Sequence, residues 1–388
     1  MRILLNNVKL WQLCIVVTLT TGLLSCKKTA NDQPDALAES SEKNRITLAT
    51  ATYTADLPTK ATIYETRTTT LSTLNVSEAT KHINNATQIN NAINNMSSQG
   101  GGTVVLNAGI YRITGPIRLK SKVRLKGVGI DESIIKRDES WTPDYDNGSD
   151  MVGTRGVISD MVISDLTIDG NTPSSSRMSN FFNMYGIRIT VDDFPGSKNQ
   201  RAYVTTIKVV NCGMGVHIKH TNDVILRNCD VEANGTLGNN TTHPSPYFFH
   251  NVYLRSIDRA QVYDGNRFIN SPSGNGLNIT AVTNLTIDAN IMTGNNFRGV
   301  RIGGASVDVV VKNNTVSNNK DFGIGTATDG GTPTRFSFVD NTISNNQGYG
   351  VKIGSNSSYG QVRGNSLSGN TPTNSVSLGN GLSNMDVQ

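Results

Sequence analysis

Aromatic and charged residues are scarce in this sequence of 388 residues. Phe, Trp and Tyr make up 6% of the chain, and Asp, Glu, Lys and Arg only 17%, which excludes a coiled coil and a solvating polyelectrolyte tail. The apolar fraction of 36% is low for a layered α/β protein of this length but sufficient for one long, thin core. The net charge of +5 is too small to favour nucleic acid as a partner.

Glycine, in contrast, is abundant at 37 residues, and Asn, Ser and Thr recur throughout. This composition suits many short strands joined by tight turns and argues against a helical bundle. β-Branched residues recur at regular intervals after residue 100, which argues against disorder. Collagen and a polytopic membrane protein are also excluded.

The N-terminus has the pattern of a targeting segment. Two basic residues precede an apolar run, Leu10–Leu24, which has the length of a signal peptide and is short for a stable membrane span. The run ends in a motif that resembles a bacterial lipobox, Leu23-Leu24-Ser25-Cys26. Cys26 would then be lipidated, and two following lysines without an adjacent Asp predict delivery to the outer membrane of a Gram-negative bacterium, on its periplasmic side or at the cell surface. An uncleaved anchor and a plain signal peptide are the alternatives.

Three regions follow from this pattern: a signal peptide over 1–25, a tether over 26–83 with at most an extended edge strand, and a folded domain over 84–388. The domain opens with a predicted helix, Asn84–Met96, with Ile89, Ala92, Ile93 and Met96 on one face. Three glycines end it before a strand begins at Thr103. Cys212 and Cys229 remain; they are either a disulfide or, as we expect, two small buried residues.

A repeat of about two dozen residues is the most informative feature of the domain. Short alternating strands that begin with Gly or Asn carry an aligned apolar residue at Val216, Val252, Leu277, Val300, Ile324 and Val351. A second series places an Asn in the turn after a strand, at Asn171, Asn266, Asn290, Asn314, Asn341 and Asn365, and Cys229 takes this position in one irregular coil.

A structure in which each period forms one coil explains this repeat, because the strands of successive coils can then stack in parallel. Alternate residues then point inward as apolar columns, and the stacked Asn side chains hydrogen-bond along the axis. We therefore predict a right-handed parallel β-helix with an N-terminal capping helix that covers the open edge. The sequence lacks the Leu pattern that a leucine-rich repeat requires, and its period is too short for the four strands of a β-propeller blade.

Residues 84–129 resemble the start of proteins of the pectate-lyase-like superfamily. The likeness is carried by Gly100-Gly101-Gly102-Thr103-Val104-Val105-Leu106-Asn107-Ala108-Gly109-Ile110-Tyr111-Arg112-Ile113 and by Pro116-Ile117-Arg118-Leu119-Lys120-Ser121. The resemblance implies the β-helix fold but leaves the activity open, because the superfamily holds lyases, hydrolases, epimerases and phage tailspikes.

The outward residues of one strand column carry the candidate site. The first outward position reads Arg188, His217, Tyr253, Asn278, Arg301, Gly325 and Lys352, and the second reads Thr190, Lys219, Arg255, Thr280, Gly303, Ala327 and Gly354. The residues just before these strands include Tyr185, His250 and Arg298. Cations and phenols gather here without Asp or Glu, although a solvated surface mixes both signs. This face therefore predicts an anionic polysaccharide as the partner.

The absence of carboxylates from both columns limits the reactions that this face can catalyse. Sugar hydrolysis requires two carboxyl groups beside the bond, and a calcium site of the pectate-lyase kind requires several. We therefore expect no cofactor, although Asp223, Asp230 and Glu232 leave a loop-borne Ca²⁺ as an alternative. Metal-free β-elimination on a uronate polymer fits the remaining residues, because it needs only a neutralised carboxylate, a base and an acid.

Roles follow as hypotheses. Lys219 is the candidate base, since Arg255 on the next coil favours its neutral form. Tyr253 or Tyr185 would move the second proton; Tyr185 has inward parity and reaches the groove only if the chain bends at Gly186. The substrate carboxylate would be bound and neutralised by Arg255, Arg301 or His217. The other substrate-binding candidates are Arg188, His250, Asn278 and Arg298.

Residues 213–303 also resemble the alginate lyases of polysaccharide lyase family thirty-one. The likeness is carried by Gly215-Val216-His217-Ile218-Lys219-His220, His250-Asn251-Val252-Tyr253-Leu254-Arg255, Ser271-Pro272-Ser273-Gly274-Asn275-Gly276-Leu277-Asn278-Ile279-Thr280 and Arg298-Gly299-Val300-Arg301. The resemblance implies a catalytic Lys and Tyr, here Lys219 and Tyr253 or Tyr185. The face is similar to that of mannuronan epimerases too, but His217-Ile218-Lys219 stands where their Asp-Pro-His signature would align.

Two points stay open. The loop from Thr236 to Phe249 is rich in aromatics, which either stack on sugar rings as a groove wall or pin the loop to the outer wall. A lipid-anchored monomer that binds acidic glycans without cleaving them is the non-enzymatic alternative to a lyase.

Overall fold

The computed structural model describes residues 68–71, 84–141, 150–172, 184–191, 196–235, 248–372 and 376–388. The predicted signal peptide, Cys26 and most of the tether lie outside these residues. Within the tether, strand β1 (Thr68–Leu71) pairs in parallel with β2 (Gly102–Leu106). No helix in the described part of the chain is long and apolar enough to cross a membrane.

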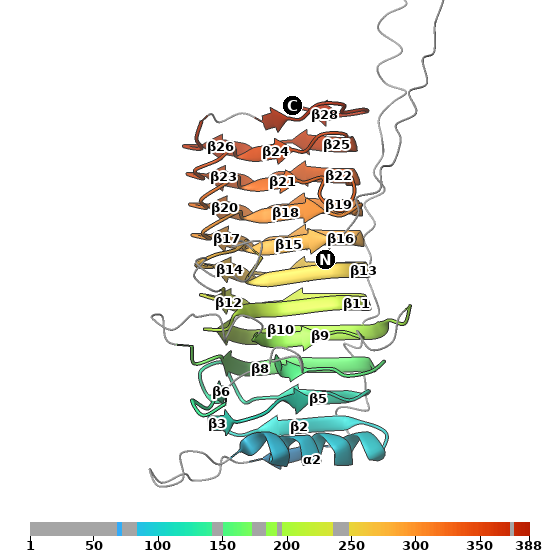
Figure 1. Cartoon of the computed structure of the whole chain (residues 1–388), viewed down its shortest axis with the longest axis vertical. Coiled ribbons are helices and arrows are strands. Elements are labelled where there is room, and N and C mark those ends of the chain that lie inside the picture. Colours follow the sequence, from blue (N-terminus) through green and yellow to red (C-terminus); the bar gives the residue numbers. More distant parts are fainter. Residues whose placement is uncertain are drawn as a thin grey trace, which may run out of the picture. The chain divides into compact units, whose positions relative to one another are not determined.

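The domain is a right-handed parallel β-helix, as the repeat predicts, and its coils stack from β2 to β28 in Figure 1. We call its three columns of parallel strands sheets I, II and III. Sheet I contains β4 (Ile117–Arg118), β7 (Asp150–Gly153), β9 (Tyr185–Ile189), the first halves of β11 (Met214–Arg227) and β13 (Val252–Tyr263), β15 (Leu277–Thr280), β18 (Val300–Gly303), β21 (Ile324–Thr326), β24 (Val351–Ile353) and β27 (Val376–Leu378).

The other two sheets complete each coil. Sheet II contains β1, β2, β5 (Val123–Lys126), the first halves of β8 (Ser159–Asp169) and β10 (Asn199–Val210), the second halves of β11 and β13, β16 (Thr283–Asp288), β19 (Val307–Lys312), β22 (Thr334–Val339), β25 (Ser358–Arg363) and β28 (Asp386–Val387). Sheet III contains β3 (Gly109–Ile113), β6 (Ser133–Arg137), the second halves of β8 and β10, β12 (Asp230–Glu232), β14 (Arg267–Ile269), β17 (Ile291–Thr293), β20 (Thr315–Ser317), β23 (Thr342–Ser344) and β26 (Ser366–Ser368).

The register on sheet I matches the predicted one. Successive coils align the inward, fully buried residues Val216, Val252, Leu277, Val300, Ile324 and Val351. The glycine that precedes most of these strands has a steric cause: a Cβ on Gly299 would lie 2.6 Å from the carbonyl oxygen of Gly323, its counterpart one coil on. Only glycine permits this close approach of successive backbones.

Two ladders of Asn side chains run along the axis, and all of their members except the half-buried Asn365 are buried. The first ladder joins Asn266, Asn290, Asn314, Asn341 and Asn365, each Nδ2 donating to the next Oδ1. It confirms the predicted series except at Asn171, whose Nδ2 instead donates to the carbonyl of Arg137. The backbone N–H of Cys229 donates to Asn266 Oδ1, so Cys229 does take the equivalent position, and both Cys212 and Cys229 are buried free thiols.

The second ladder was not predicted and lies at the corner between sheets III and I. It joins Asn234, Asn251, Asn295, Asn319, Asn346 and Asn370. Ser271 stands where one coil would carry its Asn, and its N–H donates to Asn295 Oδ1. Asn251, the residue that replaces Gly before β13, inserts its side chain there and closes the gap.

Helix α2 (Asn85–Ser98) covers the first coil, below β2 in Figure 1. It is capped by Asn84, and it buries Ile89, Ile93 and Met96 against that coil, as predicted. Asn90 bonds the exposed edge directly: its Nδ2 donates to the carbonyl of Pro116, and its Oδ1 accepts from the backbone of Arg118. The helix therefore satisfies an edge that would otherwise be open to other strands.

Candidate active site

The first outward column of sheet I has the predicted order. Cα register aligns Arg188, His217, Tyr253, Asn278, Arg301, Gly325 and Lys352 on successive coils. Lys219 aligns with Arg255, which aligns with Thr280 in the second column. Because parallel strands lie about 4.8 Å apart, these side chains form one continuous surface along the axis.

Three rings stack along this surface. The imidazole of His217 lies between the phenols of Tyr185 and Tyr253, with ring centroids 5.3 and 5.0 Å away. The Arg188 guanidinium lies 5.2 Å from the centre of the Tyr185 ring. Tyr185 thus reaches the outer face despite its inward parity, and the stack buries His217 almost completely.

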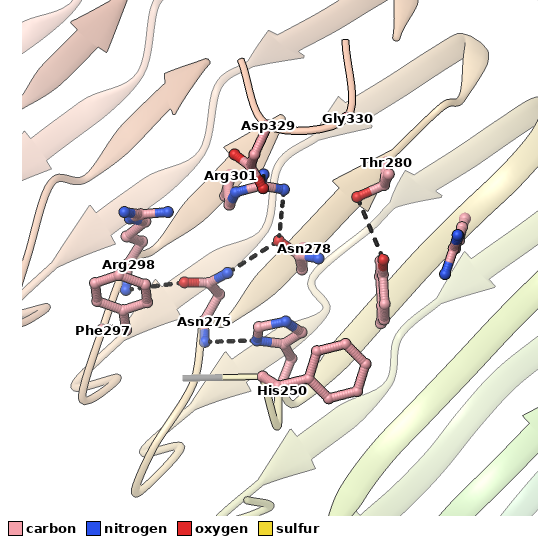
Figure 2. Close-up of a pocket in the computed structure, with 12 residues that line it drawn as sticks. His250, Asn275, Asn278, Thr280, Phe297, Arg298, Arg301, Asp329 and Gly330 are labelled. Carbon is pink, nitrogen blue, oxygen red and sulfur yellow. Dashed lines mark hydrogen bonds and ion pairs between the residues drawn. The ribbon is translucent and has the colours of Figure 1, made fainter. Parts of the chain in front are cut away.

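A pocket of about 420 Å³ opens on the next coils. Figure 2 shows its lining residues, which come from β13, β15 and β18, from the segments just before these strands, and from the turn after β21. The lining consists of Phe248, His250, Tyr253, Arg255, Asn275, Asn278, Thr280, Phe297, Arg298, Arg301, Asp329 and Gly330. It combines aromatic faces, amides and three guanidinium groups, which suits an anionic, hydroxyl-rich ligand.

His250 is held in one neutral form. The backbone N–H of Asn275 donates to its Nδ1 at 3.1 Å, so the ring proton sits on Nε2. Burial, followed by the nearby charges of Arg301, His217 and Arg298, lowers the pKa of His250 well below 6.5. The side chain therefore acts as a neutral hydrogen-bond donor at the pocket wall.

Neighbouring side chains hold Arg301 and Arg298 in place (Figure 2). Asn275 Nδ2 donates to Asn278 Oδ1 at 3.0 Å, and the same oxygen accepts from Arg301 Nη1 at 3.2 Å. The Arg298 guanidinium lies 3.9 Å from the centre of the Phe297 ring, and its Nε donates to Asp321 Oδ2 at 2.8 Å. These contacts hold both cations in place before any ligand binds, which reduces the entropic cost of binding.

The two outward columns contain no carboxylate, as the sequence predicts, but three carboxylates reach sheet I from outside these columns. Asp329, in the turn after β21, pairs with Arg301, and Asp321 pairs with Arg298. Asp150 pairs with Arg118 at the N-terminal end, where its carboxylate lies over Gly153; burial raises its pKa, and Arg118 and Arg188 oppose that effect. Strand parity could not find these residues, since two lie beyond strand ends and Asp150 has inward parity.

The pocket brings together six of the predicted residues: Tyr253, His250, Arg255, Asn278, Arg298 and Arg301. Lys219, Tyr185, His217 and Arg188 do not line it but continue the same face on the preceding coils. The other six lining residues were not among the predicted site residues, although Thr280 lies in the second outward column and Phe248 in the aromatic loop; the remaining four are Asn275, Phe297, Asp329 and Gly330. The 27-residue step from Ile324 to Val351, longer than the 24 residues before it, marks the turn that carries Asp329.

The carboxylates that suggested a loop-borne cation are engaged elsewhere. Asp223 forms a bidentate pair with Arg259, at 2.7 and 3.0 Å. Asp230 pairs with Arg267, and Glu232 with Lys208. Across the described ranges, no three His, Cys, Asp or Glu side chains lie close enough together to hold a metal ion.

Two family models match the chain. One is described as a right-handed β-helix region and matches residues 239–388. The other is described as rhamnogalacturonase A/epimerase, pectate lyase-like, and matches residues 77–169. The second match overlaps the segment whose resemblance to the pectate-lyase-like superfamily was noted in the sequence.

Curated proteins similar to this chain are named for mannuronan epimerisation and for alginate lysis. Mannuronan C5-epimerase AlgE5 of Azotobacter vinelandii is 28% identical over 232 residues, which cover 56% of this chain and 21% of that protein. Alginate lyase 7 of the same organism is 32% identical over 127 residues, which cover 31% and 14%. The chain therefore matches about a fifth or less of these relatives' length.

Solved structures share the fold. The Dettilon tailspike protein superposes with a TM-score of 0.58 at 17% identity, covering 74% of this chain and 52% of that chain. An alginate lyase from Paenibacillus sp. str. FPU-7 superposes with a TM-score of 0.52 at 15% identity, covering 83% of this chain and 99% of that chain. At these identities the likeness is one of fold.

Proposed function

We propose that sheet I binds a uronate-containing polysaccharide, with alginate as the first candidate, and cleaves it by metal-independent β-elimination. The observation that carries this proposal is the pocket in which Arg255, Arg298 and Arg301 converge beside a phenol and a neutral imidazole donor. Similarity to enzymes named for alginate lysis and mannuronan epimerisation supports the same substrate class.

Neutralisation of the substrate carboxylate is the first requirement of the reaction. Arg255, one coil on from Lys219, would pair with the C6 carboxylate of the reacting unit, and His250 Nε2–H would donate to the same sugar unit. Withdrawal of charge from the carboxylate acidifies the C5 proton and stabilises the carbanion-like transition state. The other cations, Arg188, Arg298 and Arg301, would bind neighbouring acidic units along the groove.

Proton transfer is the second requirement. The neutral amine of Lys219 would take the C5 proton, and the electron pair of the broken C5–H bond would form the C4=C5 double bond. The C4–O4 bond breaks, and O4 takes a proton from the hydroxyl of Tyr253 or Tyr185. His217 stacks between these phenols, so it would hold either ring at the reacting bond.

A C5-epimerase is the second candidate, since the mannuronan epimerases match more than half of the chain. Both reactions begin with removal of the C5 proton, but an epimerase returns a proton to the opposite face and leaves O4 bonded. A glycan-binding surface protein would do neither.

One reaction series separates these functions. The protein without residues 1–26 is incubated with mannuronate-rich, guluronate-rich and glucuronate polymers in the presence of a chelator. A rise in ultraviolet absorbance reports the new conjugated double bond and supports the lyase. Proton NMR that shows C5 inversion without that absorbance would favour the epimerase, and polymer that binds but stays unchanged would favour the glycan-binding protein.

A further inference from the structure

The turn between β21 and β22 places a carboxylate over the pocket. Its ends are tied to the preceding coil, where Ala327 N–H donates to the carbonyl of Ile302 and Thr334 N–H to that of Ser306. Gly331, at φ 121°, packs so closely on Ala305 that a Cβ would lie 2.8 Å from the Ala305 side chain. The turn is therefore seated on its neighbour, with Asp329 at the pocket (Figure 2).

Asp329 and its partner Arg301 differ strongly in solvent exposure. The Arg301 side chain is 8% exposed, whereas that of Asp329 is 79% exposed. Partial burial raises the pKa of Asp329, but its hydrogen bond to Arg301 and the charges of Arg301 and Arg298 outweigh this and lower it. A buried guanidinium thus has an exposed, ionised carboxylate as its counterion.

The geometry leaves little room for a second anion on Arg301. Its Nη1 donates to Asn278 and its Nη2 to Asp329. One face of the guanidinium lies against Gly303, where an added Cβ would lie 2.7–2.9 Å from the group. A ligand carboxylate that approached the same edge would also meet the negative charge of Asp329.

We propose that Asp329 occupies the position on Arg301 that the carboxylate of a bound uronate unit takes, so that binding exchanges one carboxylate for another. Asp329 is thereby a specificity-determining residue: an acidic sugar displaces it, whereas a neutral sugar offers Arg301 no replacement. This inference rests on the proposed function for the identity of the ligand. The contact with Arg301 also avoids a buried, uncompensated charge in the free protein.

Binding of a monosaccharide tests the exchange without turnover. Sodium glucuronate has no glycosidic bond at O4, so calorimetry with wild type and Asp329→Asn measures affinity alone. We expect Asp329→Asn to bind glucuronate about threefold to tenfold more tightly, because the ionised Asp329 carboxylate no longer competes for Arg301. Asp329→Asn should increase the affinity for the methyl ester of glucuronate less than the affinity for glucuronate itself.

Asp308→Asn is the matched control, since Asp308 makes an exposed pair with Arg335 on sheet II and its loss changes the net charge equally. It should leave the affinity unchanged. Equal or weaker binding of glucuronate to Asp329→Asn would overturn the exchange, because Asp329 would then be inert or a direct ligand of the sugar.

Sodium sulfate separates this inference from the proposed function. If wild type cleaves no uronate polymer but Asp329→Asn gains affinity for sulfate over wild type and Asp308→Asn, the exchange holds and the substrate assignment fails. If wild type cleaves alginate but Asp329→Asn gains affinity for neither anion, the lyase holds and the exchange fails.

Discussion

At the residue scale, strand parity predicted most of the outward face but not the side chains that bend onto it. Arg188, His217, Tyr253, Asn278 and Arg301 alternate with buried apolar residues, so their direction follows from the strand alone. Tyr185 could be placed only as an alternative. The contact of Asp150 depends on the close approach of coils at Gly153, and that of Asp329 on a turn whose extra length the repeat shows but whose side-chain contacts it does not specify.

His250 gives a prediction at this scale. Its pKa lies well below 6.5 in the folded protein because the ring is buried, whereas the unfolded chain protonates near 6.5. The unfolded state then binds more protons below pH 6.5, so this residue's contribution to stability is complete above pH 6.5 and is lost as the pH falls, by up to about 1.4 kcal/mol per pH unit.

Urea unfolding at pH 7.5, 6.5 and 5.5 checks this prediction. His250→Gln keeps a side chain that can accept from Asn275 N–H but does not titrate. Wild type should lose more stability than the variant between pH 6.5 and 5.5. Identical pH dependence in both proteins would mean that His250 titrates normally when folded.

At the element scale, one of the two Asn ladders could be predicted from the sequence repeat and the other could not. The first ladder was predicted because its Asn residues recur at one turn after each strand. The second was not, because pairs such as Asn318-Asn319 and Asn345-Asn346 leave the inward member ambiguous. In the structure the first Asn of each pair has φ near 56°, and the second enters the ladder. Asn readily adopts that left-handed conformation.

The neighbouring residues Asn295 and Asn296 test the ladder directly. Asn295 is fully buried and makes four side-chain hydrogen bonds, with Ser271, Asn251, Phe268 and Asn319. Asn296 is exposed and makes one, to Pro272. Asn295→Ala leaves several buried groups unpaired and should cost about 2–4 kcal/mol, whereas Asn296→Ala should cost about 0.5 kcal/mol or less.

Denaturant unfolding of both Asn variants gives the comparison. If the two substitutions cost the same, water replaces the ladder hydrogen bonds without loss, and the ladder does not contribute to stability.

At the scale of the whole domain, α2 covers the first coil and bonds its strand edge. The amphipathic pattern and the three glycines after it predicted both the helix and its role, since Ile89, Ile93 and Met96 share one face. The hydrogen bonds of Asn90 to the strand edge were not predictable, because they depend on how the helix lies across the coil.

Detachment of this cap should change the association state. Ile93→Asp places a charge in a fully buried apolar contact and should cost about 3 kcal/mol or more, exposing the edge of the first coil. Light scattering after size exclusion should show concentration-dependent association. Asn94→Asp, at the exposed next position, is the control and should remain as wild type. A monodisperse Ile93→Asp protein would contradict the protective role of the helix.

The central claim is that sheet I performs elimination on a uronate polymer with Lys219 as the base. The most direct test is the initial rate of ultraviolet absorbance increase on alginate for wild type, Lys219→Ala and the matched surface variant Lys312→Ala, whose lysine pairs with Asp288 on sheet II. The account predicts a loss of about 100-fold or more for Lys219→Ala, with polymer binding retained, and none for Lys312→Ala. Cleavage by Lys219→Ala at the wild-type rate would contradict it.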